Sequence, residues 1–410
     1  MLARFVAASG LTNLADGIAV VVWGWLGSLL TRDPILITVL PIALRLPWFL
    51  FAIPAGIITD RFDRRHLILW MDTARAALFL IVALSVWGVL PLAQAPASGV
   101  SSPGLFATLA ITALLIGLAE VIRDNAAQTM LPALVEKDRL EGANGKLLSV
   151  ELIGNSLLGP ALGAFLIAAF LPLPFALNAI AFALAAVLIF RMKGRFHPGL
   201  RARNDWKAEL GEAWRFLMAA PTLKLLAIAT GVWNLIHQMV VIALILYVQE
   251  TLSLGAPAYG LILAAGALGG ILIGAFSESI VQRLGRGRCA QWATLVTTLA
   301  FAAIPLAPGA WALAFVFFIS EGVGLIWNTV SVSYRQRTIP AVLLGRVNSL
   351  YRLMAWGMMP VGLLLAGLLT GLAEHQLTRE TAIELPFFVA GLAGIALTFA
   401  IWKPLGRAFS

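Results

Sequence analysis

The residues of this sequence that could do chemistry are ionisable side chains set inside long apolar runs. Asp16 lies midway along the first run, and Asn13 precedes it by about one helical turn on the same face. Burial disfavours the charged form of a carboxylate and a nearby guanidinium favours it, so a moving partner can switch its protonation. Asp16 is therefore a candidate proton carrier, and Arg45 in the second run is its predicted ion-pair partner.

Polar side chains recur inside the later apolar runs. Ionisable groups at membrane depth are costly and commonly mark substrate pathways or proton relays. The alternative for each of them is a static pair that orients neighbouring helices. The further candidates for the coupling site or the substrate cavity are Glu120, Glu151, Asn155, Asn234, His237, Gln238, Glu321, Asn328 and Arg352.

The elements that carry these residues are long enough to cross a membrane. Of the 410 residues, 60% are hydrophobic and 12% are charged, whereas soluble domains are about 45–50% apolar and about 25% charged. A membrane-spanning helix needs about 20 mainly apolar residues. The sequence predicts an all-α polytopic membrane protein with twelve such helices, at residues 4–30, 35–58, 67–91, 104–126, 143–169, 174–191, 222–249, 258–282, 289–307, 310–334, 346–373 and 385–402.

The distribution of Lys and Arg predicts how the spans are oriented. Only Arg32 and Arg379 of the 29 Lys and Arg residues fall in one set of alternate loops. Arg45 and Arg75 lie inside spans, and the rest lie on the other side. By the positive-inside rule that side is cytoplasmic, and an even number of spans then puts both termini there. Topology accounts for the net charge of +9, so no nucleic-acid partner is expected.

A polar segment divides the chain into two halves that resemble each other. The expected parts are an N-terminal six-helix half at 1–191, a cytoplasmic linker at 192–221 and a C-terminal six-helix half at 222–410. Within the linker, "DWKAELGEAWRFLM" (205–218) predicts an amphipathic helix that lies on the inner membrane surface or in solvent. "DRFDRR" (60–65) matches "QRLGRG" (282–287), and "GPALG" (159–163) matches "MPVGL" (359–363). Such halves form transporters whose substrate site lies between them near the bilayer midplane.

The loop between the second and third spans has an unusual density of charge. Its notable positions are Gly56, Asp60, Arg61, Arg64 and Arg65. This pattern resembles the signature loop of the major facilitator superfamily, with Asp63 where the second glycine of that signature usually stands. The variant is similar to the branch that includes enterobactin exporters and macrolide-efflux proteins. "LPALVEKDRLEGANG" and "IPAVLLGRVNSLYRL" resemble the same branch, so the resemblance covers nearly the whole chain.

The resemblance implies a role for the charged loop. In the family, the acidic residue of this loop, here Asp60, faces the start of span 11 when the transporter is open to the outside. The arginines would latch the loop to nearby carboxylates and anionic lipid heads as well as fix topology. The alternative is that these charges fix topology alone.

The resemblance also implies roles for the spans. Span 5 carries a glycine pattern common among antiporters of the family, formed by Gly154, Gly159, Pro160 and Gly163. Small residues let two helices approach closely. In the family, spans 1, 4, 7 and 10 line the central cavity. The ionisable residues that this would bring to the cavity are Asp16, Glu120, His237 and Glu321.

The expected function is that of a secondary active exporter of the major facilitator fold, not an enzyme. We expect it to move an amphipathic small molecule of the drug or siderophore class out of the cytoplasm, in exchange for protons, by alternating access. We expect a monomer in the bacterial cytoplasmic (inner) membrane with no cofactor and no metal site. The substrate, protons and the lipid bilayer would be its partners. The alternatives are a lysophospholipid or metal-ion transporter on the same fold, or a membrane sensor or scaffold that transports nothing.

Overall fold

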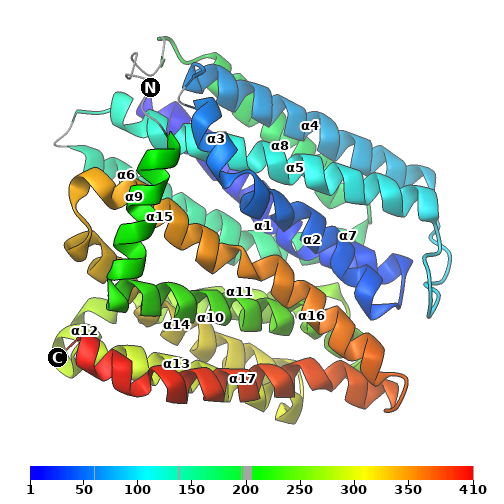
Figure 1. Cartoon of the computed structure of the whole chain (residues 1–410). Helices are drawn as coiled ribbons and strands as arrows, with labels where there is room; N and C mark the ends of the chain where they lie inside the picture. Colours follow the sequence, from blue (N-terminus) through cyan, green and yellow to red (C-terminus); the bar gives the residue numbers. More distant parts are fainter. Residues whose placement is uncertain (60, 137–138, 195, 197–205, 410) are drawn as a thin grey trace. The chain divides into compact units, whose positions relative to one another are not determined.

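The computed structural model describes residues 1–59, 61–136, 139–194, 196 and 206–409. The regular elements in these ranges are all helices (Figure 1). Helices suit an apolar chain in a membrane because a helix satisfies its own backbone N–H and C=O groups where no water is present. The α-helical fold class predicted from the apolar runs is therefore confirmed.

The chain forms two compact units. Unit 1 contains Met1–Arg201 and Gly255–Ala264, and unit 2 contains Ala202–Leu254 and Ala265–Ser410. The helices in the first stretch of unit 1 are α1 (Leu2–Leu30), α2 (Pro34–Leu50), α3 (Ala52–Thr59), α4 (Arg64–Gly88), α5 (Pro103–Met130), α6 (Leu140–Glu151), the π-helix η3 (Leu152–Leu158), α7 (Gly159–Ala169) and α8 (Leu173–Phe190), with the 3-10 turn η1 (Leu131–Ala133) after α5.

The remaining helices belong to unit 2, apart from the first part of α11. They are α9 (Trp206–Ala219), α10 (Pro221–Leu246), the π-helix η4 (Tyr247–Thr251), α11 (Ala256–Ala275), α12 (Ser277–Leu284), α13 (Arg286–Ala303), the 3-10 turn η5 (Ile304–Leu306), α14 (Ala310–Thr338), α15 (Ala341–Trp356), α16 (Met358–Ala373) and α17 (Arg379–Ala408).

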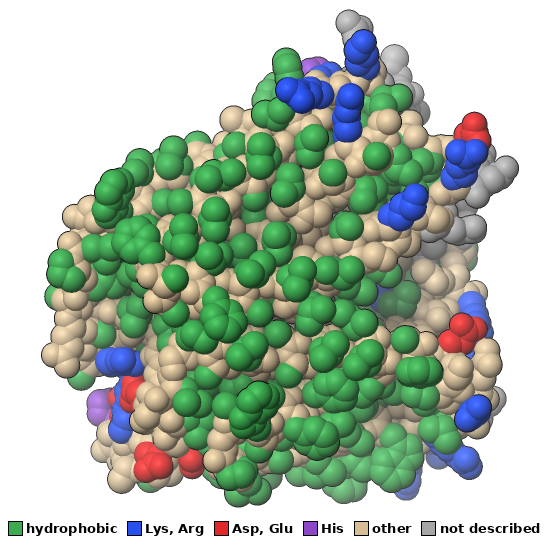
Figure 2. All heavy atoms as spheres, turned by 180° about the vertical axis from the view of Figure 1, so that it is seen from behind, with side chains coloured by type: hydrophobic (Ala, Val, Ile, Leu, Met, Phe, Trp, Pro, Cys, Tyr) green, Lys and Arg blue, Asp and Glu red, His purple; other side chains and the backbone are tan. Residues whose placement is uncertain are grey.

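The predicted spans are present as apolar helices. Within the described residues, 11 helices are long and apolar enough to cross a membrane, and Pro34–Leu50 is a shorter apolar helix. These helices correspond to the twelve predicted spans. Figure 2 shows hydrophobic side chains over most of one face of the molecule, with charged side chains gathered near its edges. Such an apolar surface fits contact with lipid, because soluble proteins rarely expose large apolar patches.

The second predicted span, 35–58, differs from the structure because it is two helices. α2 ends at Leu50 and α3 begins at Ala52. Pro54 lacks a backbone N–H and cannot donate to the carbonyl of Leu50, so the helix breaks there. The break leaves α2 to carry Arg45 and α3 to carry Gly56.

The predicted amphipathic helix of the linker is α9, and its apolar face packs against protein. Ala213 and Leu217 are fully buried in a cluster that includes Val347 and Leu350 of α15. The expected contact of this face with the membrane surface is therefore wrong for Leu217. The exposed Trp214 lies outside that buried seam. An amphipathic helix of a folded protein turns its apolar stripe toward the protein core, as α9 does here.

Candidate functional site

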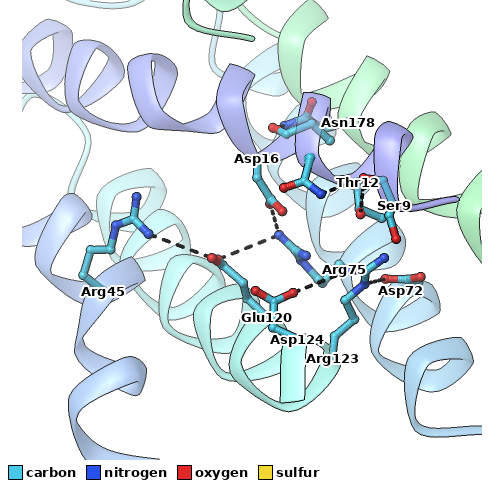
Figure 3. Close-up of polar contacts among 12 residues, drawn as sticks. Ser9, Thr12, Asp16, Arg45, Asp72, Arg75, Glu120, Arg123, Asp124 and Asn178 are labelled. Atoms are coloured by element: carbon cyan, nitrogen blue, oxygen red, sulfur yellow. Dashed lines mark hydrogen bonds and ion pairs between the residues drawn. The ribbon is translucent and has the colours of Figure 1, made fainter. Parts of the chain in front are cut away.

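A cluster of charged side chains lies inside unit 1, and each of its four central residues comes from a different helix (Figure 3). Asp16 lies on α1, Arg45 on α2, Arg75 on α4 and Glu120 on α5. All four line one pocket, together with Asn155 and apolar side chains. We call these four residues the central cluster.

The central cluster pairs its charges differently from the prediction. Asp16 forms its ion pair with Arg75, whose side chain is fully buried. Arg45 lies 3.9 Å from Glu120, and Arg75 lies 3.9 Å from the other carboxylate oxygen of Glu120. The predicted pair between Asp16 and Arg45 is therefore wrong. The cause is the packing of α2 against α5, which places Arg45 beside Glu120.

A glycine sets that packing. An added Cβ on Gly117 of α5 would collide with the carbonyl oxygen of Leu44 in α2 and would lie 3.2 Å from the ring of Pro47. The two backbones can approach this closely only because Gly117 has no side chain. Gly117 lies one turn before Glu120 and Leu44 directly precedes Arg45, so the contact holds these two charges together.

A second set of charges adjoins the central cluster on α4 and α5. Asp72 is fully buried and accepts a hydrogen bond of 3.3 Å from Nε of Arg123, which also lies 3.5 Å from Asp124. Only 5% of the Arg123 side chain is exposed, so this guanidinium lies inside the helix bundle of unit 1. The guanidinium of Arg75 lies over the ring of Phe182, with its Cζ atom 4.0 Å from the ring centroid.

The joint set of charges holds more acids than bases. It comprises the carboxylates Asp16, Asp72, Glu120 and Asp124 and the guanidinium groups Arg45, Arg75 and Arg123. The four carboxylates against three guanidinium groups leave one negative charge in excess when all are ionised. An uncompensated buried charge is costly. The set can therefore accept one proton, or one cationic group of a ligand, and become neutral.

The glycine motif of the fifth span packs directly on α1 next to Asp16. An added Cβ on Gly159 would lie 2.5 Å from the Cα of Gly17, and one on Gly163 would lie 2.7 Å from the carbonyl oxygen of Ile18. On Gly154 it would meet the backbone of Leu14 at 3.0 Å. The absence of side chains therefore fixes the position of the helical turn that carries Asp16.

The structure separates the other candidates of unit 1. Asn155 lines the pocket with Asp16, whereas Glu151 is exposed at the end of α6. The π-helix η3 follows Glu151 and changes the helical register, and Pro160 follows as an early residue of α7. Asn13 does not line this pocket, and its Nδ2 donates a 2.8 Å hydrogen bond to the carbonyl of Ser9 in its own helix.

Unit 2 brings together two predicted residues from α10 and α14. Nε2 of His237 lies 2.8 Å from Oε1 of Glu321, and both side chains are partly exposed, at 28% and 37%. One turn earlier on α10, Nδ2 of Asn234 donates a 2.9 Å hydrogen bond to the carbonyl of Ala355. The ring of Phe301 lies 6.1 Å from that of His237.

Three further predicted residues of unit 2 take no part in the contact between His237 and Glu321. Gln238 is half-buried on α10. Asn328 is exposed on α14. Arg352 is exposed on α15, and its guanidinium lies 5.3 Å from the ring of Trp356.

The arginines of the charged loop bind the ends of helices. Arg64 donates a 2.8 Å hydrogen bond to the carbonyl of Thr129 in the last turn of α5. Arg65 donates to the carbonyls of Ile189 at 3.1 Å and Phe190 at 2.5 Å in the last turn of α8. The predicted bonds of these two arginines to carboxylates are therefore wrong. The last carbonyls of a helix lack helical partners and carry partial negative charge, so guanidinium groups satisfy them.

Two other described loop residues, Gly56 and Arg61, take no part in these bonds. Asp60 lies outside the described residues, so its predicted contact with span 11 stays a prediction. Arg61 is exposed, and Gly56 is half-buried in α3 with open space around the position of an added Cβ.

Asp63 stands where the superfamily signature loop usually has its second glycine, and its side chain accepts two hydrogen bonds. Its Oδ1 accepts a 3.2 Å hydrogen bond from the N–H of His66 and caps α4, and its Oδ2 accepts a 2.7 Å hydrogen bond from the N–H of Phe196. The N–H of Arg64 donates to the carbonyl of Phe196 at 3.3 Å. The matching position of the second copy is Gly285, with φ of +84°. Asp63 has φ of −62°, which suits a non-glycine residue.

Asp72 is not among the site residues predicted from the sequence, and Arg75 is placed inside a span there without an assigned role. Their spacing could have revealed them, because Asp72 and Arg75 are three residues apart inside one predicted apolar span. Two opposite charges at that spacing share one helix face. Such a pair at membrane depth indicates partners on neighbouring helices, which here are Asp16 and Arg123.

Comparison with known proteins finds relatives along nearly the whole chain. A family model described as transmembrane secretion effector matches residues 2–404. The multidrug efflux pump Tap of Mycolicibacterium fortuitum is 26% identical over 397 residues, which cover 93% of this chain and 92% of that protein. The protein of the same name from Mycobacterium tuberculosis (strain ATCC 25618 / H37Rv) is 25% identical over 414 residues, which cover 97% of this chain and 92% of that protein.

Solved structures show a similar fold. A D-xylose–proton symporter has a TM-score of 0.72 and 14% identity, and the match covers 98% of this chain and 96% of that one. A bacterial homologue of the iron transporter ferroportin, in an inward-facing state, has a TM-score of 0.71 and 17% identity, covering 99% and 98%. At these identities the likeness shows the fold alone. This protein is an integral membrane transporter of the major facilitator superfamily, not an enzyme, and it belongs to the transmembrane secretion effector family.

Proposed function

We propose that this protein exports amphipathic small molecules of the drug or siderophore class in exchange for protons, by alternating access. The joint set of charges, formed by the central cluster with Asp72, Arg123 and Asp124, carries the proposal, because it holds one carboxylate in excess inside a membrane helix bundle. The relatives named multidrug efflux pumps support the export of a drug-like substrate.

The coupling step follows from the positions of the two acids in the pocket. Asp16 has a direct partner in Arg75, and Glu120 lies 3.9 Å from both Arg45 and Arg75. When a proton neutralises one of these carboxylates, its guanidinium partner becomes free to strengthen its interaction with the other. Protonation would thus change which helices are tied together, and this change is the physical basis for driving a conformational step.

The same excess charge would allow exchange between substrate and proton. A cationic group of an amphipathic substrate can neutralise the excess charge of the joint set as a proton does, so the two compete for the same charge. A proton arriving from outside would then favour release of the substrate. Antiport requires this competition, because the transporter must change conformation with either the proton or the substrate bound, and not with neither or with both.

The His237–Glu321 pair is a second place where protonation could enter the cycle. An imidazole of ordinary character changes charge near neutral pH, and this one touches a carboxylate in unit 2. We propose that the pair contributes to coupling in unit 2 as the central cluster does in unit 1. A static polar pair between α10 and α14 is the alternative.

The test is pH-driven counterflow in vesicles that contain the purified protein. Vesicles loaded with ethidium, an amphipathic cation, should lose it faster when an inward proton gradient is imposed. Asp16→Asn and Glu120→Gln should each weaken the response to the gradient, whereas Glu136→Gln, a change at an exposed carboxylate, should leave it intact. If Asp16→Asn, Glu120→Gln and Glu321→Gln all still couple ethidium efflux to the gradient, the scheme is wrong. Gradient-independent movement of a lysophospholipid or a divalent ion would favour the alternative substrates.

The orientation and domain arrangement form part of the same proposal. We propose a monomer in the bacterial inner membrane, with both termini in the cytoplasm as the Lys and Arg distribution predicts. We further propose that 192–221 joins an N-terminal half at 1–191 to a C-terminal half at 222–410. Labelling of single cysteines introduced near each terminus, with the native Cys289 replaced by alanine, would test the orientation.

A further inference from the structure

A groove opens on unit 2 between the first turns of α10 and the last turns of α17. Its volume is about 410 Å³. The two helices pack side by side along their length (Figure 1), and the groove lies where α17 contains Pro404 and the small side chain of Ala408. Proline inside a helix bends it, and alanine leaves space, so the surface is hollowed at this point.

The groove has a cationic part and an apolar part. Lys224 of α10 and Arg407 of α17 both line it, and both are exposed. Ile228 lies one turn after Lys224 on the same face of α10, and 48% of its surface is exposed. Leu225 lines the same wall. A ligand that fills the groove must therefore be anionic at one end and apolar at the other.

The position of the groove along the membrane normal matches this polarity. Pro221 begins the apolar stretch that contains α10, and Ala408 ends the one formed by α17. The cations thus lie at the border of the membrane, and Ile228 lies roughly 6 Å deeper along the helix axis than Lys224. The orientation predicted from Lys and Arg places this border at the cytoplasmic leaflet.

We propose that the groove binds an anionic phospholipid, whose phosphate contacts Lys224 and Arg407 and whose acyl chain lies against Leu225 and Ile228. Arginine presents a planar pair of donors that matches a phosphate, and lysine adds a compact charge. Basic pockets between membrane helices on the cytoplasmic side suit anionic headgroups. The apolar wall distinguishes a lipid from free phosphate, which would gain nothing from it. This site is independent of the proposed proton coupling and of the substrate.

The test is lipid binding to the purified full-length protein in detergent, measured as the rise in Tm on titration. The probes are dioleoyl phosphatidylglycerol, dioleoyl phosphatidylcholine and inorganic phosphate. We expect phosphatidylglycerol to raise the Tm and the other two to have little effect. Lys224→Gln with Arg407→Gln should weaken the apparent affinity for phosphatidylglycerol about 30-fold, from the usual contribution of a basic residue near anionic lipid.

Two further variants separate the site from general charge and from misfolding. Lys146→Gln with Lys193→Gln removes the same charge at exposed positions that do not line the groove and should leave the affinity unchanged. Ile228→Trp keeps every charge but obstructs the apolar part, and it should also weaken binding. An equal loss in the groove and control pairs would overturn the proposal, as would an equal effect of inorganic phosphate or unchanged binding by Ile228→Trp.

Discussion

Arg75 on α4 forms an ion pair with Asp16 on α1, and the guanidinium is fully buried. This pair joins two helices of unit 1 at the wall of the pocket that Glu120 also lines. It replaces the pairing expected from sequence position, and it makes Arg75 the cation that both pocket carboxylates share.

The Asp16–Arg75 pair should show strong energetic coupling. Arg75→Met leaves Asp16 without its cation, and removing one partner of a buried pair typically costs about 3–5 kcal/mol. We expect this variant to lower the Tm clearly and to abolish gradient-driven efflux. The double variant Asp16→Asn with Arg75→Met should recover much of the stability, because no charge is then left unpaired, yet it should remain inactive. Additive losses of Tm in the double variant would contradict the pairing.

The contact between Gly159 and Gly17 should tolerate no side chain. Gly159→Ala places a Cβ 2.5 Å from the Cα of Gly17, and backbone on both sides prevents an easy adjustment. Overpacking of this kind commonly costs about 1–3 kcal/mol. We expect a lower Tm and weaker transport, because α1 and Asp16 must move to make room.

A matched control for that change lies in the preceding helix. Gly145 of α6 has open space around an added Cβ. Gly145→Ala should keep transport and stabilise slightly, since alanine favours a helix over glycine by about 1 kcal/mol or less. Similar losses for Gly145→Ala and Gly159→Ala would show that helix propensity, and not the close approach to α1, decides the result.

Asp63 should matter through its carboxylate and not through its backbone. Asp63→Ala removes the cap of α4, which is usually worth about 1 kcal/mol, together with the hydrogen bond to the N–H of Phe196. We expect a lower Tm, with Asp63→Asn keeping part of the cap. At the matching position, Gly285→Ala should destabilise for a different reason, because φ is +84° there. Equal tolerance of Asp63→Ala and Asp63→Asn would rule out a stabilising role for the Asp63 side chain as the cap of α4.

The His237–Glu321 pair should act as one unit. Glu321→Gln removes the carboxylate and His237→Asn removes the imidazole of the 2.8 Å pair between α10 and α14, so each should lower ethidium efflux and alter its pH profile between about pH 5 and 8. The double variant should have an efflux rate no lower than that of the more impaired single variant, because a shared interaction can be lost only once. The measurement is the efflux rate across that pH range. Multiplicative losses would show that the two residues act separately.

Much of the fold could be predicted from the sequence because it depends on local composition. Apolar runs of sufficient length form membrane helices wherever they pack, so the spans and the family could be inferred without a structure. The break after Leu50 shows the limit, because Pro54 lay inside a run that composition alone made continuous. The candidates Asp16, Glu120, His237 and Glu321 were also visible as charges at membrane depth.

The sequence by itself determined that this is a helical membrane transporter of its superfamily and which charged residues lie inside its spans. Only the tertiary structure decided the partners: Asp16 with Arg75, Arg45 with Glu120, and Asp72 with Arg123. Partners depend on the rotation and closeness of helices far apart in the chain. Those quantities are set by backbone contacts at Gly117, Gly159 and Gly163, and composition does not encode them.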